Sequence, residues 1–174
     1  MKLNKLYLTD CESKIFMANL SSTKHSTDKY ASWLNDPEVN KYLETKEVTK
    51  SDLIIYIDEK NKSKDALLLG IFCKTSGNHI GNIKLEPIKN RTATMGIMLG
   101  DREYWGKGYG YQASKLLIKY AFNDMQIDCI NLGVVSTHKT AIKLYKKLGF
   151  DIVDTRIGVL KNNQDQIVME LKKI

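Results

Sequence analysis

Residues 104–111 read Tyr-Trp-Gly-Lys-Gly-Tyr-Gly-Tyr, with glycine at the alternate positions 106, 108 and 110. An apolar run at 97–99 precedes this stretch, and apolar residues at helical spacing follow it from 113 to 121. This order predicts a strand, a glycine loop and the start of a helix. The N–H groups of such a loop and the positive dipole end of the helix suit a pyrophosphate. A strand-to-helix turn without a ligand is the alternative explanation.

Composition sets limits on the kind of protein. Of the 174 residues, 43% are hydrophobic and 27% are charged, which is typical of a folded globular domain, and we expect one domain over residues 1–174. The formal charge of +7 favours anionic partners such as phosphorylated cofactors or nucleotide-linked substrates. Lysines are scattered, without the arginine and aromatic pattern that reads nucleic acid, so we expect no nucleic-acid partner.

Three cysteines lie far apart at positions 11, 73 and 129, and no cluster of histidine and cysteine has the spacing of metal ligands. The sequence therefore predicts reduced thiols and no metal. No apolar run approaches the roughly 20 residues of a membrane span, and the N-terminus lacks a signal-peptide pattern. We expect a cytoplasmic protein without a membrane partner.

The N-terminal half combines short strands and short helices. Alternating apolar residues at 3–9 and 14–20 predict an edge hairpin or one extended strand, and 21–26 is expected to be a loop. Helices are expected after a cap at Thr27 or Asp28, after Asp36-Pro37 through Leu43, and after a capping box at Thr49 that leads to about residue 62.

The C-terminal part predicts a meander followed by alternating strands and helices. Strands are expected at 67–73, 79–85, 92–99, 130–135, 150–160 and 166–171, and helices at 109–123 and from 137 or 138 to Gly149. This order predicts an α+β (mixed α/β) protein with helices on the faces of a mixed sheet.

Two segments resemble the signatures of the GNAT acetyltransferases. Residues 105–110, Trp-Gly-Lys-Gly-Tyr-Gly, are similar to the family's acetyl-CoA pyrophosphate loop, Arg/Gln-x-x-Gly-x-Gly/Ala. Residues 138–150, His-Lys-Thr-Ala-Ile-Lys-Leu-Tyr-Lys-Lys-Leu-Gly-Phe, resemble its Asn-x-x-Ala-x-x-Leu-Tyr-x-Lys-x-Gly-Phe segment. The likeness runs from about residue 14 to the C-terminus. It implies a central mixed, mostly antiparallel sheet of about seven strands, splayed at the cofactor site and flanked by four to five helices.

The resemblance also indicates a branch of the family. Trp105 in place of Arg or Gln, with Trp-Leu-Asn-Asp-Pro-Glu-Val at 33–39, is most similar to ribosomal-protein N-terminal acetyltransferases and to acetyltransferases of amino sugars for surface polysaccharides.

The resemblance implies a cofactor site between two strands. The strand at 94–99 would separate from the one at 130–135 and admit the pantetheine of acetyl-CoA. The residues that it implies as cofactor contacts are Met98, Leu99, Trp105, Gly106, Lys107, Gly108, Tyr109, Gly110, Tyr111 and His138. His138 replaces the family's asparagine, so both cofactor contact and helix capping stay open for it.

Tyr145 is the expected general acid. A phenol with a pKa of about 10 stays protonated at pH 7 and can supply a proton to a leaving thiol, whose pKa is about 8.5. The alternative is packing, because Tyr145 shares the apolar face of its helix with Leu144 and Leu148.

The base and the acceptor pocket are less explicit. The branch often has glutamate where this chain has Thr94, which cannot accept the proton. Water is one alternative base, and the side chains considered, each also explicable as a surface or turn residue, are Glu86, Glu44, Asp36 and His79. The residues expected to border the acceptor are Trp33, Tyr42 and Glu86, with Tyr104 beside them, although Trp33 also suits the core.

The expected activity is transfer of acetyl from acetyl-CoA to a primary amine, by direct attack in a ternary complex of a monomer or homodimer. A nucleotide-linked amino sugar fits the basic charge, and a protein N-terminus or another small-molecule or peptide amine is the alternative acceptor. Two hypotheses of other classes remain. One is a non-catalytic acyl-CoA-binding or sensor domain, which Thr94 would suit. The other is a nucleic-acid binder with salt-dependent affinity.

Overall fold

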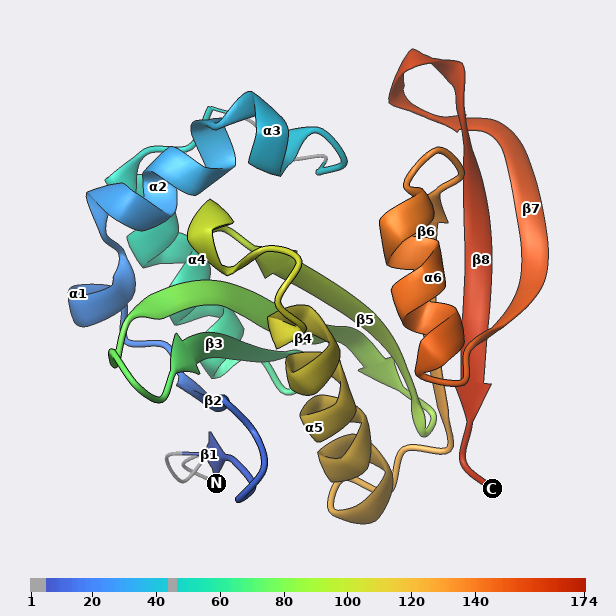
Figure 1. Cartoon of the computed structure of the whole chain (residues 1–174), viewed down its shortest axis with the longest axis horizontal. Helices are drawn as coiled ribbons and strands as arrows, with labels where there is room; N and C mark the ends of the chain where they lie inside the picture. Colours follow the sequence, from blue (N-terminus) through green and yellow to red (C-terminus); the bar gives the residue numbers. More distant parts are fainter. Residues whose placement is uncertain (1–5, 44–46) are drawn as a thin grey trace.

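The computed structural model describes residues 6–43 and 47–174 of the chain (Figure 1). Its strands are β1 Tyr7–Leu8, β2 Ile15–Asn19, β3 Leu67–Cys73, β4 His79–Lys89, β5 Thr92–Leu99, β6 Cys129–Val135, β7 Asp151–Leu160 and β8 Gln164–Lys172. Its α-helices are α1 Ser22–His25, α2 Asp28–Asn35, α3 Pro37–Asn40, α4 Lys50–Lys62, α5 Tyr109–Asn123 and α6 Lys139–Lys147. Short 3-10 turns occupy Arg102–Tyr104 and Lys161–Asn163.

All strands within these residues join one sheet in the order β1-β2-β3-β4-β5-β6-β8-β7. Every neighbouring pair is antiparallel except β5 and β6, which run parallel. The mixed, mostly antiparallel sheet expected from the sequence is thereby confirmed. In the described residues it has eight strands rather than about seven, because the opening stretch forms the separate edge strands β1 and β2.

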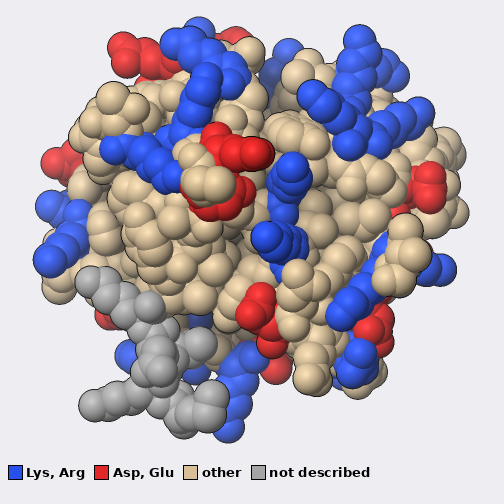
Figure 2. All heavy atoms as spheres, turned by 60° about the horizontal axis from the view of Figure 1, so that its bottom comes forward, with Lys and Arg blue, Asp and Glu red and all other residues tan. Residues whose placement is uncertain are grey.

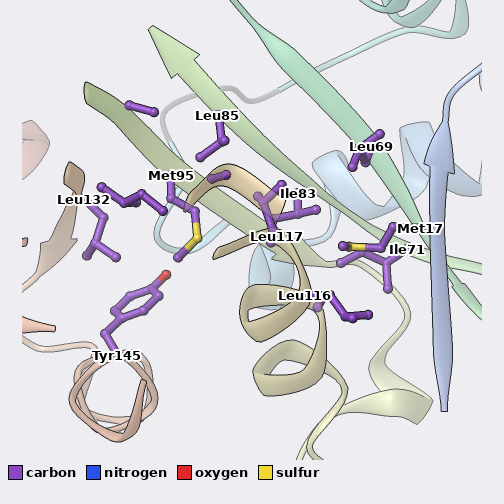
Figure 3. Packing of buried hydrophobic residues seen from close by; sticks show 14 of the residues in the cluster. Met17, Leu69, Ile71, Ile83, Leu85, Met95, Leu116, Leu117, Leu132 and Tyr145 are labelled. Atoms are coloured by element: carbon purple, nitrogen blue, oxygen red, sulfur yellow. The ribbon is translucent and has the colours of Figure 1, made fainter. Parts of the chain in front are cut away.

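Two hydrophobic clusters place the helices on opposite faces of the sheet. α2, α3 and α4 bury side chains such as Trp33 and Leu53 with Leu68 of β3. α5 and α6 bury Leu117 and Tyr145 in the other cluster, which includes the strand residues labelled in Figure 3. Because successive side chains of a strand point to opposite faces, the same strands contribute residues to both clusters.

Local capping fixes where the N-terminal helices begin. The Thr27 hydroxyl accepts from the Tyr30 N–H at α2, the Asp36 carboxylate from the Glu38 N–H at α3, and Thr49 forms the expected capping box with Asp52 at α4.

Two expectations for this region were wrong. α3 ends at Asn40 rather than continuing through Leu43, and the buried Asn40 amide donates to the Leu34 carbonyl at 2.8 Å. The segment expected to be a loop contains the one-turn α1. There the His25 ring accepts from the Ser21 N–H at 2.7 Å, a bond that apolar spacing does not reveal.

The pairing of β5 with β6 stops after three residues. The register joins Thr92 with Cys129, Ala93 with Ile130 and Thr94 with Asn131. Beyond this point β5 continues to Leu99 on β4, and β6 continues to Val135 on β8. The Thr94 hydroxyl donates to the Asn131 amide oxygen at 2.7 Å at the last paired position. The sheet is therefore splayed from Thr94 onward, as the resemblance implied.

The surface bears basic and acidic side chains over many elements. Figure 2 shows Lys and Arg spread across one face, with Asp and Glu among them. Within residues 6–43 and 47–174, no helix combines the length and apolar character needed to cross a membrane.

Candidate functional site

The glycine loop has the backbone shape of an anion cradle. Gly106 and Gly108 adopt φ of 70° and 83°, and no atom lies within 4 Å of where a Cβ would stand at either residue. Gly108 precedes α5, whose N-terminus receives no side-chain cap within the described chain. The first N–H groups of α5 are therefore free of the usual side-chain acceptor, and they lie where the helix dipole favours negative charge. Exposed Lys107 adds a cation, so this loop fits a pyrophosphate.

The third glycine has a packing role. A Cβ on Gly110 would meet the Leu99 and Leu144 side chains at 3.5 and 3.6 Å, which is ordinary van der Waals distance, so this residue lies where α5 packs on β5 and α6. The neighbouring rings point elsewhere: Tyr109 packs edge-on against Tyr104, and Tyr111 lies under the ammonium group of Lys147, 4.7 Å away. Both tyrosines belong to the first turn of α5, so it is their backbone, rather than their rings, that lies next to the glycine loop.

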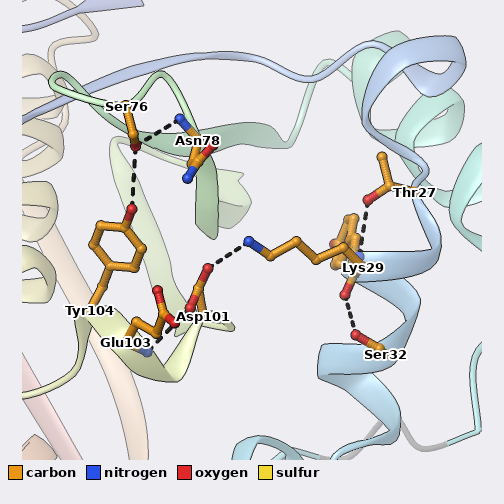
Figure 4. Close-up of polar contacts among 9 residues, drawn as sticks. Thr27, Lys29, Ser32, Ser76, Asn78, Asp101, Glu103 and Tyr104 are labelled. Carbon is orange, nitrogen blue, oxygen red and sulfur yellow. Dashed lines mark hydrogen bonds and ion pairs between the residues drawn. The ribbon is translucent and has the colours of Figure 1, made fainter.

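Polar contacts hold the segment before the loop in place. The Trp105 indole N–H donates to the Leu99 carbonyl at 2.8 Å, which ties the loop to the end of β5. The Tyr104 hydroxyl lies 3.3 Å from the Ser76 hydroxyl (Figure 4). Lys29 of α2 pairs with Asp101 at 2.6 Å. The loop is thereby braced against both β5 and α2.

Met98 and Leu99 lie on the splayed part of β5, where β6 offers no pairing partner in the described register. Successive strand residues direct their backbone groups to opposite edges, and the Leu99 carbonyl, which accepts from Trp105, lies on the edge turned away from β4. The two residues have opposite side-chain directions, since Leu99 packs with the α5 side and Met98 with the α2 and α4 side.

Tyr145 projects from α6 toward the sheet. Its phenol oxygen is directed toward Met95, close to Leu132 of β6 (Figure 3). The residue is only 8% exposed, and this burial raises the pKa of Tyr145 to about 12. Burial disfavours the charged phenolate, so the hydroxyl remains a proton donor at neutral pH. The sequence offered a packing role and a general-acid role for Tyr145 as alternatives, and this buried position is compatible with both.

His138 stacks on Tyr42. Their ring centroids are 4.0 Å apart with an interplanar angle of 14°, and the Lys41 ammonium lies 5.4 Å from the Tyr42 ring. Burial and the Lys41 charge lower the pKa of His138. His138 is the N-cap residue of α6 but makes no side-chain cap bond. This stack joins the chain that follows α3 to the start of α6.

The side chains considered as bases are engaged elsewhere. The Asp36 carboxylate caps α3 and lies 3.7 Å from Arg102. His79 bonds to the Asn82 amide oxygen at 2.8 Å, and burial lowers the pKa of His79 to about 4. Glu44 lies outside the described residues.

Glu86 is held between two lysines. Partial burial acts to raise its pKa, but hydrogen bonds from Lys60 and Lys84 outweigh this and lower the pKa of Glu86. A carboxylate with a lowered pKa is a weaker base, and both of its oxygens are already engaged by lysines.

Trp33 occupies the core beneath the end of β5. It is 5% exposed, and a Cβ on Gly100 would lie 2.0 Å from its ring, so the ring rests directly on the backbone at the end of β5. Tyr42, in contrast, reaches α6. Among the three residues expected to border the acceptor, Trp33 therefore lies in the core, as its alternative explanation had it.

Sequence reasoning missed Asn82, Lys84 and Asn131, which accompany Thr94 on one face of the splay. Polar residues at every second position of β4 were the available signal. Within the described residues, no group of three or more His, Cys, Asp or Glu side chains forms a metal site.

The GNAT family model, described as "Acetyltransferase (GNAT) domain", matches residues 19–151, which is more than half of the chain. The chain belongs to the GNAT acetyltransferase family. The GNAT chain is 30% identical over 129 residues to the uncharacterized N-acetyltransferase p20 of Bacillus licheniformis, covering 71% of this chain and 72% of that protein.

Solved GNAT structures share the fold. Spermidine N-acetyltransferase from Vibrio cholerae, in complex with CoA and spermine, superposes with a TM-score of 0.83 at 18% identity, over 92% of this chain and 96% of that one. The microcin C7 self-immunity acetyltransferase MccE, in complex with acetyl-CoA and AMP, gives a TM-score of 0.80 at 20% identity, over 93% and 94%. This GNAT protein is an acetyl-CoA-dependent N-acetyltransferase.

Proposed function

We propose that this protein acetylates a primary amine by direct attack of the uncharged amine on the thioester while both substrates are bound. The observation that carries the proposal is the end of β5–β6 pairing at Thr94, beside the uncapped N-terminus of α5 and the buried hydroxyl of Tyr145. Acetyl-CoA, when bound, supplies the thioester. The chain's own contribution is to position the reactants, and proximity carries much of the rate.

Each residue has a definite task in this proposal. N–H groups of residues 106–110 hold the pyrophosphate, and an N–H on the outer side of Met98 or Leu99 hydrogen-bonds the thioester oxygen as negative charge develops there. A C–N bond forms and the C–S bond breaks. The Tyr145 hydroxyl gives its proton to the departing sulfur, and the proton of the attacking amine passes to water. No cysteine is required as a nucleophile.

We propose that the acceptor is an amino sugar linked to a nucleotide, and that the chain belongs to the branch that modifies protein N-termini and surface amino sugars. The net charge of +7 supports an anionic acceptor, and the MccE structure shows that this fold accommodates AMP together with acetyl-CoA. A protein N-terminus or another small amine is the alternative acceptor.

A non-catalytic acyl-CoA sensor is a second candidate, favoured by the absence of a carboxylate at Thr94, whose hydroxyl is committed to Asn131. Measuring CoA thiol release across a panel of amines, with product masses, separates the two. The enzyme hypothesis expects amine-dependent release and a matching acetylated product, whereas a sensor would bind CoA without either.

Tyr145→Phe tests the acid. The substitution keeps the ring and its packing but removes the hydroxyl, so kcat should fall about 100-fold while the melting temperature stays close to that of the wild type. Tyr120→Phe on the outer part of α5 is the matched control and should leave kcat unchanged. An unaffected kcat in Tyr145→Phe would remove the acid role.

A further inference from the structure

A polar stripe runs along β4 on the face that α1–α4 cover. Asn82, Lys84 and Glu86 occupy alternate positions, so their side chains share this face. The neighbouring strand β3 is apolar on this face: Leu68, the register partner of Lys84, belongs to a hydrophobic cluster. The stripe therefore marks the border between that cluster and β5.

The stripe carries an excess of positive charge. The Lys84 ammonium lies 3.1 Å from one Glu86 carboxylate oxygen, and Lys60, in the last turn of α4, pairs with the other. In the described part of the chain, both lysines have their ion pairs with this single carboxylate. Two cations therefore share one anion. The side chains are 21–40% exposed, so the remaining positive charge is only partly screened by water.

Lys84 lies next to the splay. Its register partner is Gly96 of β5, and a Cβ on Gly96 would be 3.5 and 3.6 Å from the Lys84 Cε and Cγ atoms. The lysine chain thus crosses β5 two residues beyond Thr94, the last residue paired with β6. The glycine loop and α5 approach the splay from the opposite face of the sheet. An amine that reaches the thioester from the face of α2–α4 therefore passes Lys84.

A second polar group faces the same way. Asn82 is 6% exposed and stands opposite Met98. Its oxygen accepts from the His79 ring, while its Nδ2 group is buried without a partner among the described residues. A buried donor without an acceptor is costly, so this amide is a second polar group on the same face that the packing leaves unexplained.

We propose that the acceptor amine carries an anionic group, a carboxylate or a phosphate, that pairs with Lys84 beside the splay, on the face of α2–α4. The inference rests on the proposed amine acetylation and names the feature that selects the amine. A polycation would meet repulsion there. The same positive charge favours the uncharged form of a nearby amine, which is the form that attacks.

Matched acceptors test the selection. Glucosamine 6-phosphate is compared with glucosamine, and 6-aminohexanoate with 6-aminohexanamide, by kcat/KM at saturating acetyl-CoA. A charge-assisted hydrogen bond predicts roughly a 10- to 100-fold preference for the anionic member of at least one pair. The pair with the larger ratio tells phosphate from carboxylate. Equal rates within both pairs would overturn this inference alone, whereas no acetylation of any amine would overturn the proposed function as well.

Variants then locate the selection. Lys84→Met should bring the ratio close to one, mainly through a higher KM for the anionic member, and Lys84→Arg should retain the preference. Lys119→Met, an exposed site on α5, is the control and should keep the wild-type ratio. A wild-type ratio in Lys84→Met would overturn the role of Lys84. If this variant does not fold, Lys84→Gln is measured in its place.

Discussion

Tyr145 shows how one side chain serves packing and chemistry together. Its ring belongs to the main hydrophobic cluster, and the same burial that stabilises the ring keeps its hydroxyl protonated. Its family motif and its helical spacing were both readable from the sequence. The direction of its hydroxyl was not, because that depends on how α6 lies on β5 and β6.

His79 gives a pH-dependent stability that the sequence does not suggest. Burial lowers its folded-state pKa to about 4, and the nearby His25 ring, 5.8 Å away, adds to the effect. Because the unfolded chain binds the proton at a pKa of about 6.5, stability is complete above that pH and is lost as the pH falls toward 4. Urea unfolding between pH 7.5 and 4 should show a loss on the order of 3 kcal/mol.

The substitution His79→Gln tests whether His79 causes this loss of stability at low pH. Glutamine keeps a donor for Asn82 but does not titrate, so the unfolding free energy of the variant should change less between pH 6.5 and 4. A slope equal to that of the wild type would assign the effect to other groups.

The glycine loop forms the strand, loop and helix start that its sequence predicts. Gly77, a glycine outside the loop with a similar backbone angle, provides a control for substitutions in it. Gly108→Ala should raise the KM for acetyl-CoA, because a Cβ enters the open cradle, and should cost about 1 kcal/mol through its φ of 83°. Gly77→Ala, at φ 71° with equally open surroundings, should lose similar stability without affecting this KM. Thermal unfolding and initial rates measure both. Equal KM changes would contradict the cradle.

Other elements show what local patterns can and cannot predict. Caps at Thr27 and Thr49 act on N–H groups within a few residues, so their positions could be predicted. The ends of helices were harder. α3 stops where Asn40 bonds back to Leu34, and α1 is held by a histidine ring, both through single side-chain contacts that leave no periodic signal.

At the scale of the molecule, the arrangement of α5, α6 and the splay followed from the family resemblance rather than from periodicity. The contacts across the site could not be predicted at all. The pairing of Lys60 with Glu86, and the stacking of Tyr42 on His138, join segments far apart in sequence. They depend on strand register and helix placement, which the sequence specifies only through the complete fold.

The proposed reaction uses both faces of the sheet at the splay between β5 and β6. In this proposal the cosubstrate binds on the face of α5 and the amine on the face of Lys84, so both can be bound at the same time. Initial rates measured at several fixed concentrations of each substrate should therefore give intersecting reciprocal plots, and parallel lines would instead indicate an acetylated enzyme. Free CoA and the acetylated amine should then each be released on the face where the corresponding substrate bound, so that neither product blocks the release of the other.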